Sequence, residues 1–311
     1  MTAVASAGVI LATSASLSPR RGPHGATADN QHYVNSKESG PSLEEGGPSP
    51  PDTAYSLGEA ALSGKDACMA DDFFGDQVAE RYDTSQDDMF ANEAIEPAID
   101  VLAELAGDGA ALELGIGTGR LALPLSRRGV PVHGIDLSSA MLARLAAKPG
   151  AEQIGVTLGD FAHTRVPGSF QLGYLVFNTI MNLTSQDEQV ACFGNVAAHL
   201  DVGGCFVIEV MVPDLQRLPP GETVRPFTVA ATKLGFDEYD LVTQRLVSHH
   251  YRWDGDRLES SSIPFRYVWP AELDLMARIA GMTLLHRWND WHRNPFTSDS
   301  RQHVSVWQKA R

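Results

Sequence analysis

Residues 111–120 read Ala-Leu-Glu-Leu-Gly-Ile-Gly-Thr-Gly-Arg, an apolar run followed by three glycines at alternate positions. The apolar run is typical of a buried strand, and the residues after Arg120 have helical spacing. Glycine permits positive φ and has no Cβ, so a ligand can approach the bare backbone of the turn. The first N–H groups of the following helix attract negative charge. The pattern predicts a strand, a ligand-binding turn and a helix.

Two carboxylates follow, each at the end of a later apolar run. Asp136 ends the run Val-His-Gly-Ile-Asp, about 20 residues beyond the glycine turn, where nucleoside-binding α/β folds hold a ribose diol. Asp160 lies in Leu-Gly-Asp-Phe at the end of the third run. It offers an acceptor for an adenine amine, and Phe161 offers an aromatic face beside it. We therefore expect a nucleoside pocket at the ends of these runs.

Apolar runs alternate with helical patterns along most of the chain. Helices are predicted at 73–82 and 90–105, with Pro97 in the first turn of the second, where its missing N–H costs nothing. Seven runs of strand length follow, at 110–114, 130–135, 154–158, 170–177, 205–211, 282–288 and 303–308. The helical patterns between them end at Arg128, Ala147, Leu200 and Ala280. This alternation predicts an α/β fold with a doubly wound, mostly parallel seven-stranded sheet.

Beyond Pro213 the apolar period changes to two. Segments at 223–231, 246–253 and 257–268 alternate apolar and polar residues, which indicates an antiparallel lid inserted at about 214–267. Asp254-Gly255 lies between the last two segments. This dipeptide favours a type I′ turn, in which both central residues have positive φ.

Residues 1–68 have a different composition from the rest. Ser, Gly, Pro, Ala and Thr dominate, which predicts a disordered tail before a domain at 69–311, with Met69 as an alternative start. The apolar run at 3–17 has no preceding Lys or Arg and no clean cleavage site, so it does not predict export. No run reaches the length of a membrane span.

Charge and cysteine usage narrow the function classes. The formal net charge is -15, which disfavours nucleic acid as a partner because backbone binding depends on clustered Lys and Arg. Cys68, Cys192 and Cys205 cannot all pair, and none has metal-ligand spacing, so we expect cytoplasmic, thiol-independent chemistry without a metal.

As a set, Glu-Leu-Gly-Ile-Gly-Thr-Gly, Gly-Ile-Asp-Leu-Ser and Gly-Asp-Phe resemble the first motifs of class I S-adenosylmethionine-dependent methyltransferases. The resemblance covers Asp72 to Arg311 and implies a Rossmann-like methyltransferase fold with S-adenosyl-L-methionine as cofactor. A nicotinamide fingerprint expects glycine or alanine at Arg120 and does not expect Glu113 before the first glycine. An NAD(P)-dependent oxidoreductase and a cofactor-binding regulatory protein without catalysis remain the alternatives.

The resemblance also implies which residues bind the cofactor. The glycines would line the methionine portion, and Glu113 would orient its ammonium group. Asp136 would hold the ribose, Asp160 and Phe161 would complete the adenine pocket, and Tyr82 would close over the cofactor carboxylate. The full set is Tyr82, Glu113, Gly115, Gly117, Gly119, Asp136, Leu137, Asp160, Phe161 and Asn178.

Residues that could contact the methyl acceptor follow the fourth predicted strand and lie in later polar clusters. The segment 177–183 is not Asn-Pro-Pro-Tyr, which counts against methylation of nucleobase amines. Asn178 and Asn182 are the polar groups expected nearest the sulfonium. An alcohol acceptor needs a general base, whereas an amine delivered as the free base does not. The candidate bases are His249, His250 and His292, of which at most one serves, since strand alternation puts the first two on opposite faces.

The inserted lid resembles that of aminosugar N-methyltransferases and related natural-product enzymes. This likeness implies that Arg266 and Tyr267 contact substrate and that the protein forms a homodimer. We therefore expect methyl transfer to an N or O atom of a small molecule, such as a sugar or secondary metabolite. The acidic balance disfavours a protein or RNA acceptor.

Overall fold

The structure, a computed structural model, describes Ala79 and residues 92–310. Ala79 is helical, within the helix predicted at 73–82. The predicted tail at 1–68, the alternative start at Met69 and the cofactor candidate Tyr82 lie outside the described residues. In the described part, no helix is both long and apolar enough to cross a membrane.

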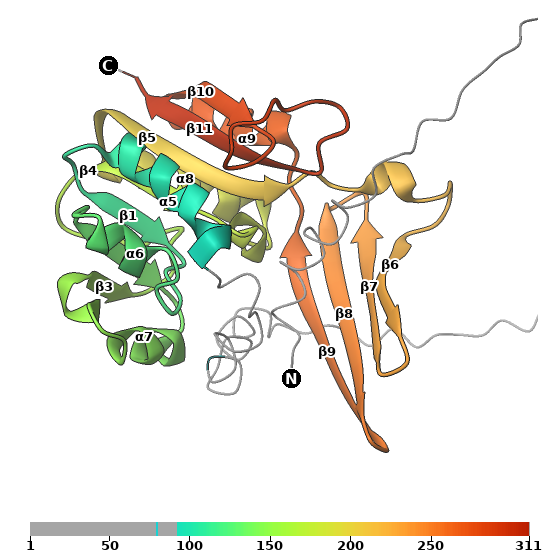
Figure 1. Cartoon of the computed structure of the whole chain (residues 1–311). Helices are drawn as coiled ribbons and strands as arrows, with labels where there is room; N and C mark the ends of the chain where they lie inside the picture. Colours follow the sequence, from blue (N-terminus) through green and yellow to red (C-terminus); the bar gives the residue numbers. More distant parts are fainter. Residues whose placement is uncertain (1–78, 80–91, 311) are drawn as a thin grey trace, which may run out of the picture. The chain divides into compact units, whose positions relative to one another are not determined.

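Seven strands form the central sheet (Figure 1). They are β1 (Ala111–Leu114), β2 (Val132–Asp136), β3 (Gly155–Leu158), β4 (Phe170–Leu175), β5 (Leu200–Met211), β10 (Met282–Trp288) and β11 (Gln302–Lys309). Their order is β10-β11-β5-β4-β1-β2-β3, and β11 runs antiparallel to both of its neighbours. The other neighbouring pairs are parallel, so the predicted doubly wound, mostly parallel sheet is confirmed.

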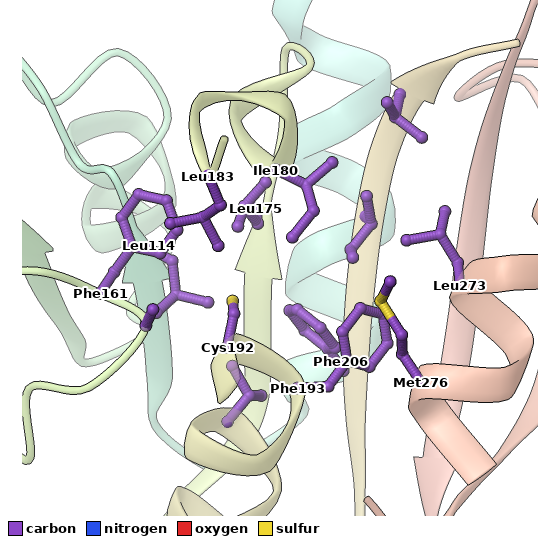
Figure 2. Close-up of a cluster of buried hydrophobic side chains, with 14 of the residues drawn as sticks. Leu114, Phe161, Leu175, Ile180, Leu183, Cys192, Phe193, Phe206, Leu273 and Met276 are labelled. Carbon is purple, nitrogen blue, oxygen red and sulfur yellow. The ribbon is translucent and has the colours of Figure 1, made fainter. Parts of the chain in front are cut away.

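Helices cover both faces of this sheet. They are α5 (Asn92–Ala106), α6 (Ala122–Arg127) and α7 (Ser139–Ala146) on one face, and α8 (Gln186–His199) and α9 (Pro270–Ile279) on the other. Figure 2 shows the second face, where Phe193 of α8 and Met276 of α9 pack beside Phe206 of β5. One buried hydrophobic cluster therefore lies on each face of the sheet. Close packing of the two clusters holds the carboxyl ends of the parallel strands in fixed positions.

Pro97 does not lie where the sequence predicts. Helix α5 begins at Asn92, so Pro97 is inside it rather than in its first turn. Proline has no N–H to bond the carbonyl four residues earlier, which weakens the helix there. Burial of Ile99 and Leu102 against the sheet offsets this cost.

The inserted lid is a four-stranded antiparallel sheet. Its strands are β6 (Val224–Ala230), β7 (Lys233–Asp240), β8 (Arg245–Asp254) and β9 (Arg257–Arg266), paired in chain order. The sequence indicates three of them and misses β7. Gly255 and Asp256 form the loop between β8 and β9, and of these only Gly255 has positive φ. This matches a type II′ turn, so the predicted type I′ turn is wrong.

Arg266 joins the lid to the core. Its guanidinium donates hydrogen bonds to Gln189 of α8, to Gln244 (Nη2 to Oε1, 3.0 Å) and to Glu272 of α9 (Nη2 to Oε1, 2.7 Å). The side chain of Gln189 donates in return to the Arg266 carbonyl at 3.2 Å. Arg266 is only 4% exposed, and these bonds place its charge between the lid and two helices.

That Arg266 and Tyr267 contact substrate stays a prediction, and the structure gives both residues packing and hydrogen-bonding partners within the protein. Arg266 is occupied by its buried partners, and Tyr267 packs against Tyr239 and Trp269 in the core. Both residues stabilise the junction between the lid and the α/β domain. A charged side chain at the end of a strand signals a binding role only if its partners leave it accessible, and a single sequence does not show those partners.

Candidate active site

The glycine turn leaves β1 in a backbone conformation that L side chains rarely adopt. Gly115, Gly117 and Gly119 have φ values of 71°, 55° and 79°. A Cβ on Gly115 would lie 2.8 Å from Thr179, and one on Gly119 would lie 2.4 Å from Leu145. These positions therefore require glycine, and the turn presents backbone without side chains at the carboxyl edge of the sheet.

Asp136 lies directly beside this turn at the end of β2. Its Oδ2 accepts a hydrogen bond from the Gly117 N–H at 2.7 Å, and its Oδ1 accepts one from the Ser138 N–H at 2.8 Å. Burial raises the pKa of Asp136, and the two backbone bonds oppose that rise. The next residue, Leu137, is 40% exposed, an accessible apolar surface beside the carboxylate.

Glu113 is buried beneath the turn. Tyr174 of β4 donates a hydrogen bond from its hydroxyl to Glu113 Oε2 at 2.8 Å. Burial raises the pKa of Glu113 to about 8, against the lowering effects of this bond and of Arg120. Glu113 is therefore mostly protonated at neutral pH. The sequence does not indicate Tyr174 as its partner, because the two residues lie on separate strands.

We expect Glu113→Gln to change how stability depends on pH. Between the ordinary value of 4.5 and about 8, the folded protein holds a proton on Glu113 that the unfolded chain releases. Stability of the wild type relative to the variant should then fall by roughly 1 kcal/mol per pH unit as pH rises through this window. Urea unfolding at pH 5, 6 and 7 measures it, with exposed Glu222→Gln as control. Equal pH dependence in wild type and Glu113→Gln would contradict the burial effect.

Asp160 and Phe161 follow β3 at the same edge. Asp160 Oδ1 accepts a hydrogen bond from the Ala162 N–H at 2.8 Å, and its Oδ2 pairs with His163 Nδ1 at 2.5 Å. Phe161 is largely buried, and its carbonyl accepts a bond from Asn195 at 2.8 Å. The structure thus brings this segment, the glycine turn and Asp136 to one edge of the sheet.

The segment after β4 is fastened to β5. Asn178 has a left-handed φ of 63°, and its Oδ1 accepts a hydrogen bond from the Met211 N–H at 2.7 Å. Glu209 accepts bonds from the Phe177 N–H at 3.2 Å and from Trp291 Nε1 at 2.9 Å. These bonds fix the loop that leads into the short helix η2 (Thr179–Asn182).

Arg120 lies within this group, although the sequence does not indicate its role. Its guanidinium stacks over the Phe177 ring, 3.2 Å from the centroid. Its positive charge opposes the pKa rise that burial causes at Glu113 and at Glu209. Besides Tyr174, Arg120 and Glu209 are the residues missed by sequence reasoning. Arg120 and Glu209 each had one signal in the sequence: Arg120 directly follows the last glycine of the turn, and Glu209 is a carboxylate inside an apolar strand.

The three candidate bases are separated in the structure. His249 stacks on Phe236, and its ring nitrogens meet Ser262 Oγ at 2.8 Å and Glu238 Oε2 at 3.2 Å. His250 packs on the other face of β8. Burial lowers the pKa of His250 to about 4. His292 is exposed beyond β10.

Comparison with known proteins settles the family. A model described as "Methyltransferase domain" matches residues 111–204. The solved CcbJ methyltransferase from Streptomyces caelestis is 35% identical, with a TM-score of 0.67, over 76% of this chain and 98% of that chain. The chain belongs to the class I S-adenosylmethionine-dependent methyltransferases. The methyltransferase therefore takes its methyl group from S-adenosylmethionine, and the nicotinamide and non-catalytic alternatives are wrong.

Two further relatives align with a large part of this methyltransferase. The cypemycin N-terminal methyltransferase of a Streptomyces species is 27% identical over 206 residues, which are 64% of this chain and 82% of that protein. The amino pentose methyltransferase CalS10 from Micromonospora echinaspora, solved with S-adenosylmethionine bound, is 22% identical with a TM-score of 0.54. It aligns over 71% of this chain and 92% of its own. At that identity CalS10 supports the fold alone.

Proposed function

We propose that the glycine turn and the ends of β2, β3 and β4 hold S-adenosylmethionine. Bound there, the cofactor supplies a methyl group on a positively charged sulfur. The residues fit it: the glycines leave bare backbone for the methionine portion, Asp136 offers a carboxylate to the ribose, and exposed Leu137 offers an apolar surface to the adenine. Asp160 and Phe161 lie at the same edge. The assignments of Glu113 and Asn178 stay predictions.

We further propose that the acceptor is an amine nitrogen of a small molecule. The observation that carries this is the state of the two histidines on the lid, His249 and His250. Both ring nitrogens of His249 are engaged, and the low pKa of His250 makes it a weak base. An amine delivered as its free base attacks with its own lone pair and does not need a strong base, whereas a hydroxyl does. The name of the cypemycin relative, an N-terminal methyltransferase, agrees with this choice.

The lid supports a small acceptor. Strand β9 contacts η2, the segment directly after β4, so the lid stands at the edge where the cofactor residues meet. Ile263 of β9 and Ile180 of η2 belong to one buried cluster. Asn182 ends η2, half-buried, and is the polar side chain of this segment that we assign to the acceptor. An acceptor held between the lid and this edge is shielded from water, as methyl transfer requires.

Paired amine and alcohol acceptors test this proposal. The full chain is incubated with S-adenosylmethionine and with D-glucosamine, D-glucose, a proline amide or the matching hydroxy amide, and S-adenosylhomocysteine release is followed by chromatography. We expect turnover of amine-bearing acceptors, with products one methyl group heavier at nitrogen. Turnover confined to the alcohols would mean that the acceptor atom is oxygen rather than nitrogen. If neither class is turned over, a small amine acceptor is excluded.

The outward face of the lid predicts a homodimer. Phe236, His249 and Tyr251 stack there, and Trp253 and Leu258 on the same face remain 39% and 51% exposed. Exposed aromatic and aliphatic surface of this kind is typical of protein interfaces. We expect sedimentation velocity to show a dimer that Trp253→Asp converts to monomer, while Val242→Asp, on the loop after β7, leaves it intact. A monomeric wild type would contradict the prediction.

A further inference from the structure

The order of the strands gives the cofactor a direction across the sheet. In the proposed site, Asp160 and Phe161 follow β3, Asp136 ends β2, and the glycine turn follows β1. In the sheet, β3, β2, β1 and β4 are successive neighbours. With the adenine at β3 and the ribose at β2, the methionine portion extends over the turn toward β4. We therefore expect the amino acid group of the cofactor beside the segment after β4.

Arg120 reaches this end of the site from the last position of the glycine turn. Its guanidinium carbon lies 3.2 Å from the centroid of the Phe177 ring, and Phe177 is in the segment after β4. The other end of the turn is close to the same segment, since a Cβ on Gly115 would lie 2.8 Å from Thr179 Cγ2. Arg120 thus places a cation where we expect the amino acid group.

The ring beneath Arg120 is held in an unusual backbone conformation. Phe177 and Asn178 have φ values of 57° and 63°, a region that bulky residues rarely adopt. The Phe177 N–H donates to Glu209 Oε2 at 3.2 Å, and the Asn178 N–H donates to the Glu209 carbonyl at 3.2 Å. Backbone strain of this kind persists where the surroundings enforce it, and it is common at ligand sites. Here it fixes the ring on which the guanidinium stacks.

The charges around Arg120 suit a ligand carboxylate. Stacking engages the face of a guanidinium, whereas its N–H donors lie in its plane and match a carboxylate bidentately. The nearby Glu113 is mostly protonated at neutral pH, because burial raises its pKa to about 8. Both oxygens of Glu209 accept hydrogen bonds, from Phe177 and from Trp291. An amino acid group carries an ammonium beside its carboxylate, so it adds no net charge to this cluster.

The cofactor carboxylate needs a local cation because the chain as a whole repels anions. The formal net charge is -15. Tyr82, which the family resemblance assigns to this carboxylate, is neutral at pH 7. Lys148 also reaches the turn, where its Nζ donates to the Thr118 carbonyl at 2.8 Å. However, Lys148 follows α7, which contacts β2 and β3, so it lies on the adenine side of the turn.

We propose that Arg120 binds the carboxylate of the methionine portion of S-adenosylmethionine. Its guanidinium donates N–H bonds to the carboxylate, and Phe177 is a positioning residue that holds the guanidinium plane. Arg120 thereby makes the methyltransferase select a cofactor whose carboxylate is intact. The inference rests on the proposed function, since it deepens the cofactor site described there.

Calorimetric titration of the full chain with S-adenosylmethionine and with decarboxylated S-adenosylmethionine tests the inference, because the two ligands differ only in this carboxylate. We expect the wild type to prefer S-adenosylmethionine at least tenfold, although an acidic protein would otherwise favour the more cationic ligand. Arg120→Met should reduce the preference to below twofold. Arg120→Lys keeps the charge without the planar fork and should lose at least threefold of the preference.

Two further variants complete the series. Phe177→Leu should lower the preference while leaving the affinity for the decarboxylated ligand within twofold, which a merely structural role of the ring would not do. Arg144→Met removes an equal charge from the exposed face of α7 and should keep the full preference. Binding of the decarboxylated ligand shows that each variant is folded, and if Arg120→Met does not fold, Arg120→Lys decides.

A wild type without preference, or a full preference retained in both Arg120 variants, would overturn the role of Arg120. Asp136→Ala separates this outcome from failure of the proposed site, because it should weaken both ligands by the same factor and leave their ratio unchanged. Binding that depends on Asp136, with a ratio that does not depend on Arg120, keeps the site and overturns the inference. If the wild type binds neither ligand, the proposed site fails and the inference fails with it.

Discussion

Asp136→Ala is expected to weaken S-adenosylhomocysteine binding by at least 100-fold. The variant removes the carboxylate that we assign to the two ribose hydroxyls, and each hydrogen bond to a charged group contributes about 1.5–3 kcal/mol. It also removes the acceptor of the Gly117 N–H, which holds the glycine turn beside β2. The two losses act on the same ligand, so the effect should exceed that of a single hydrogen bond.

Calorimetric titration measures this change. Asp201→Ala is the matched control, since Asp201 is an exposed aspartate near the start of β5 and its replacement changes the charge equally. The control should bind S-adenosylhomocysteine as the wild type does. A loss below fivefold in Asp136→Ala would mean that the ribose lies elsewhere, and the assignment of the whole nucleoside pocket would then fail.

Arg266→Met is expected to lower the free energy of unfolding by about 3 kcal/mol. The methionine fills much of the same volume but leaves Glu272, Gln189 and Gln244 without their shared donor. Removing one partner of a buried ion pair typically costs this much, because the other charge stays buried without compensation.

Urea unfolding of the full chain tests this prediction against Arg245→Met. Arg245 pairs in register with Arg266 across β8 and β9 but is exposed, so the control changes the same residue type at the adjacent position of the sheet. We expect the control to lie within about 0.5 kcal/mol of wild type. Similar unfolding free energies for both variants would show that Arg266 does not hold the lid.

The sequence predicts the α/β core because strand and helix patterns depend only on residues that are close together in the chain. Alternating apolar runs and helical spacing locate the seven strands, and the Gly115 to Gly119 turn needs glycine for reasons visible in the residue type alone. Strand β7 escapes prediction because Gly235 and the charged residues at its end obscure the alternation. Its partners β6 and β8 stabilise it as a strand.

Side-chain partnerships are harder to predict, because they join residues far apart in the chain. Tyr174 reaches Glu113 across neighbouring strands, and Trp291 reaches Glu209 from beyond β10. Arg266 is a further example, since its partners Gln189 and Glu272 lie on helices that the sequence does not place beside the strand. Polar residues at strand ends can therefore be recognised as a group from sequence, whereas their individual roles need the fold.

The lid is inserted between β5 and α9, where the chain leaves the sheet at β5 and rejoins it at β10, two positions along. The chain departs after β5 and returns through α9 to β10, and β11 then pairs with both β10 and β5. The Val212 N–H donates a hydrogen bond to the Arg301 carbonyl at 2.8 Å. Such an excursion can be lengthened, shortened or exchanged during evolution without disturbing the parallel strands that end at the nucleoside pocket. The lid, and with it the acceptor preference, can thus change in evolution while the pocket for the methyl donor is kept. The two parts act as modules under different selection within one polypeptide.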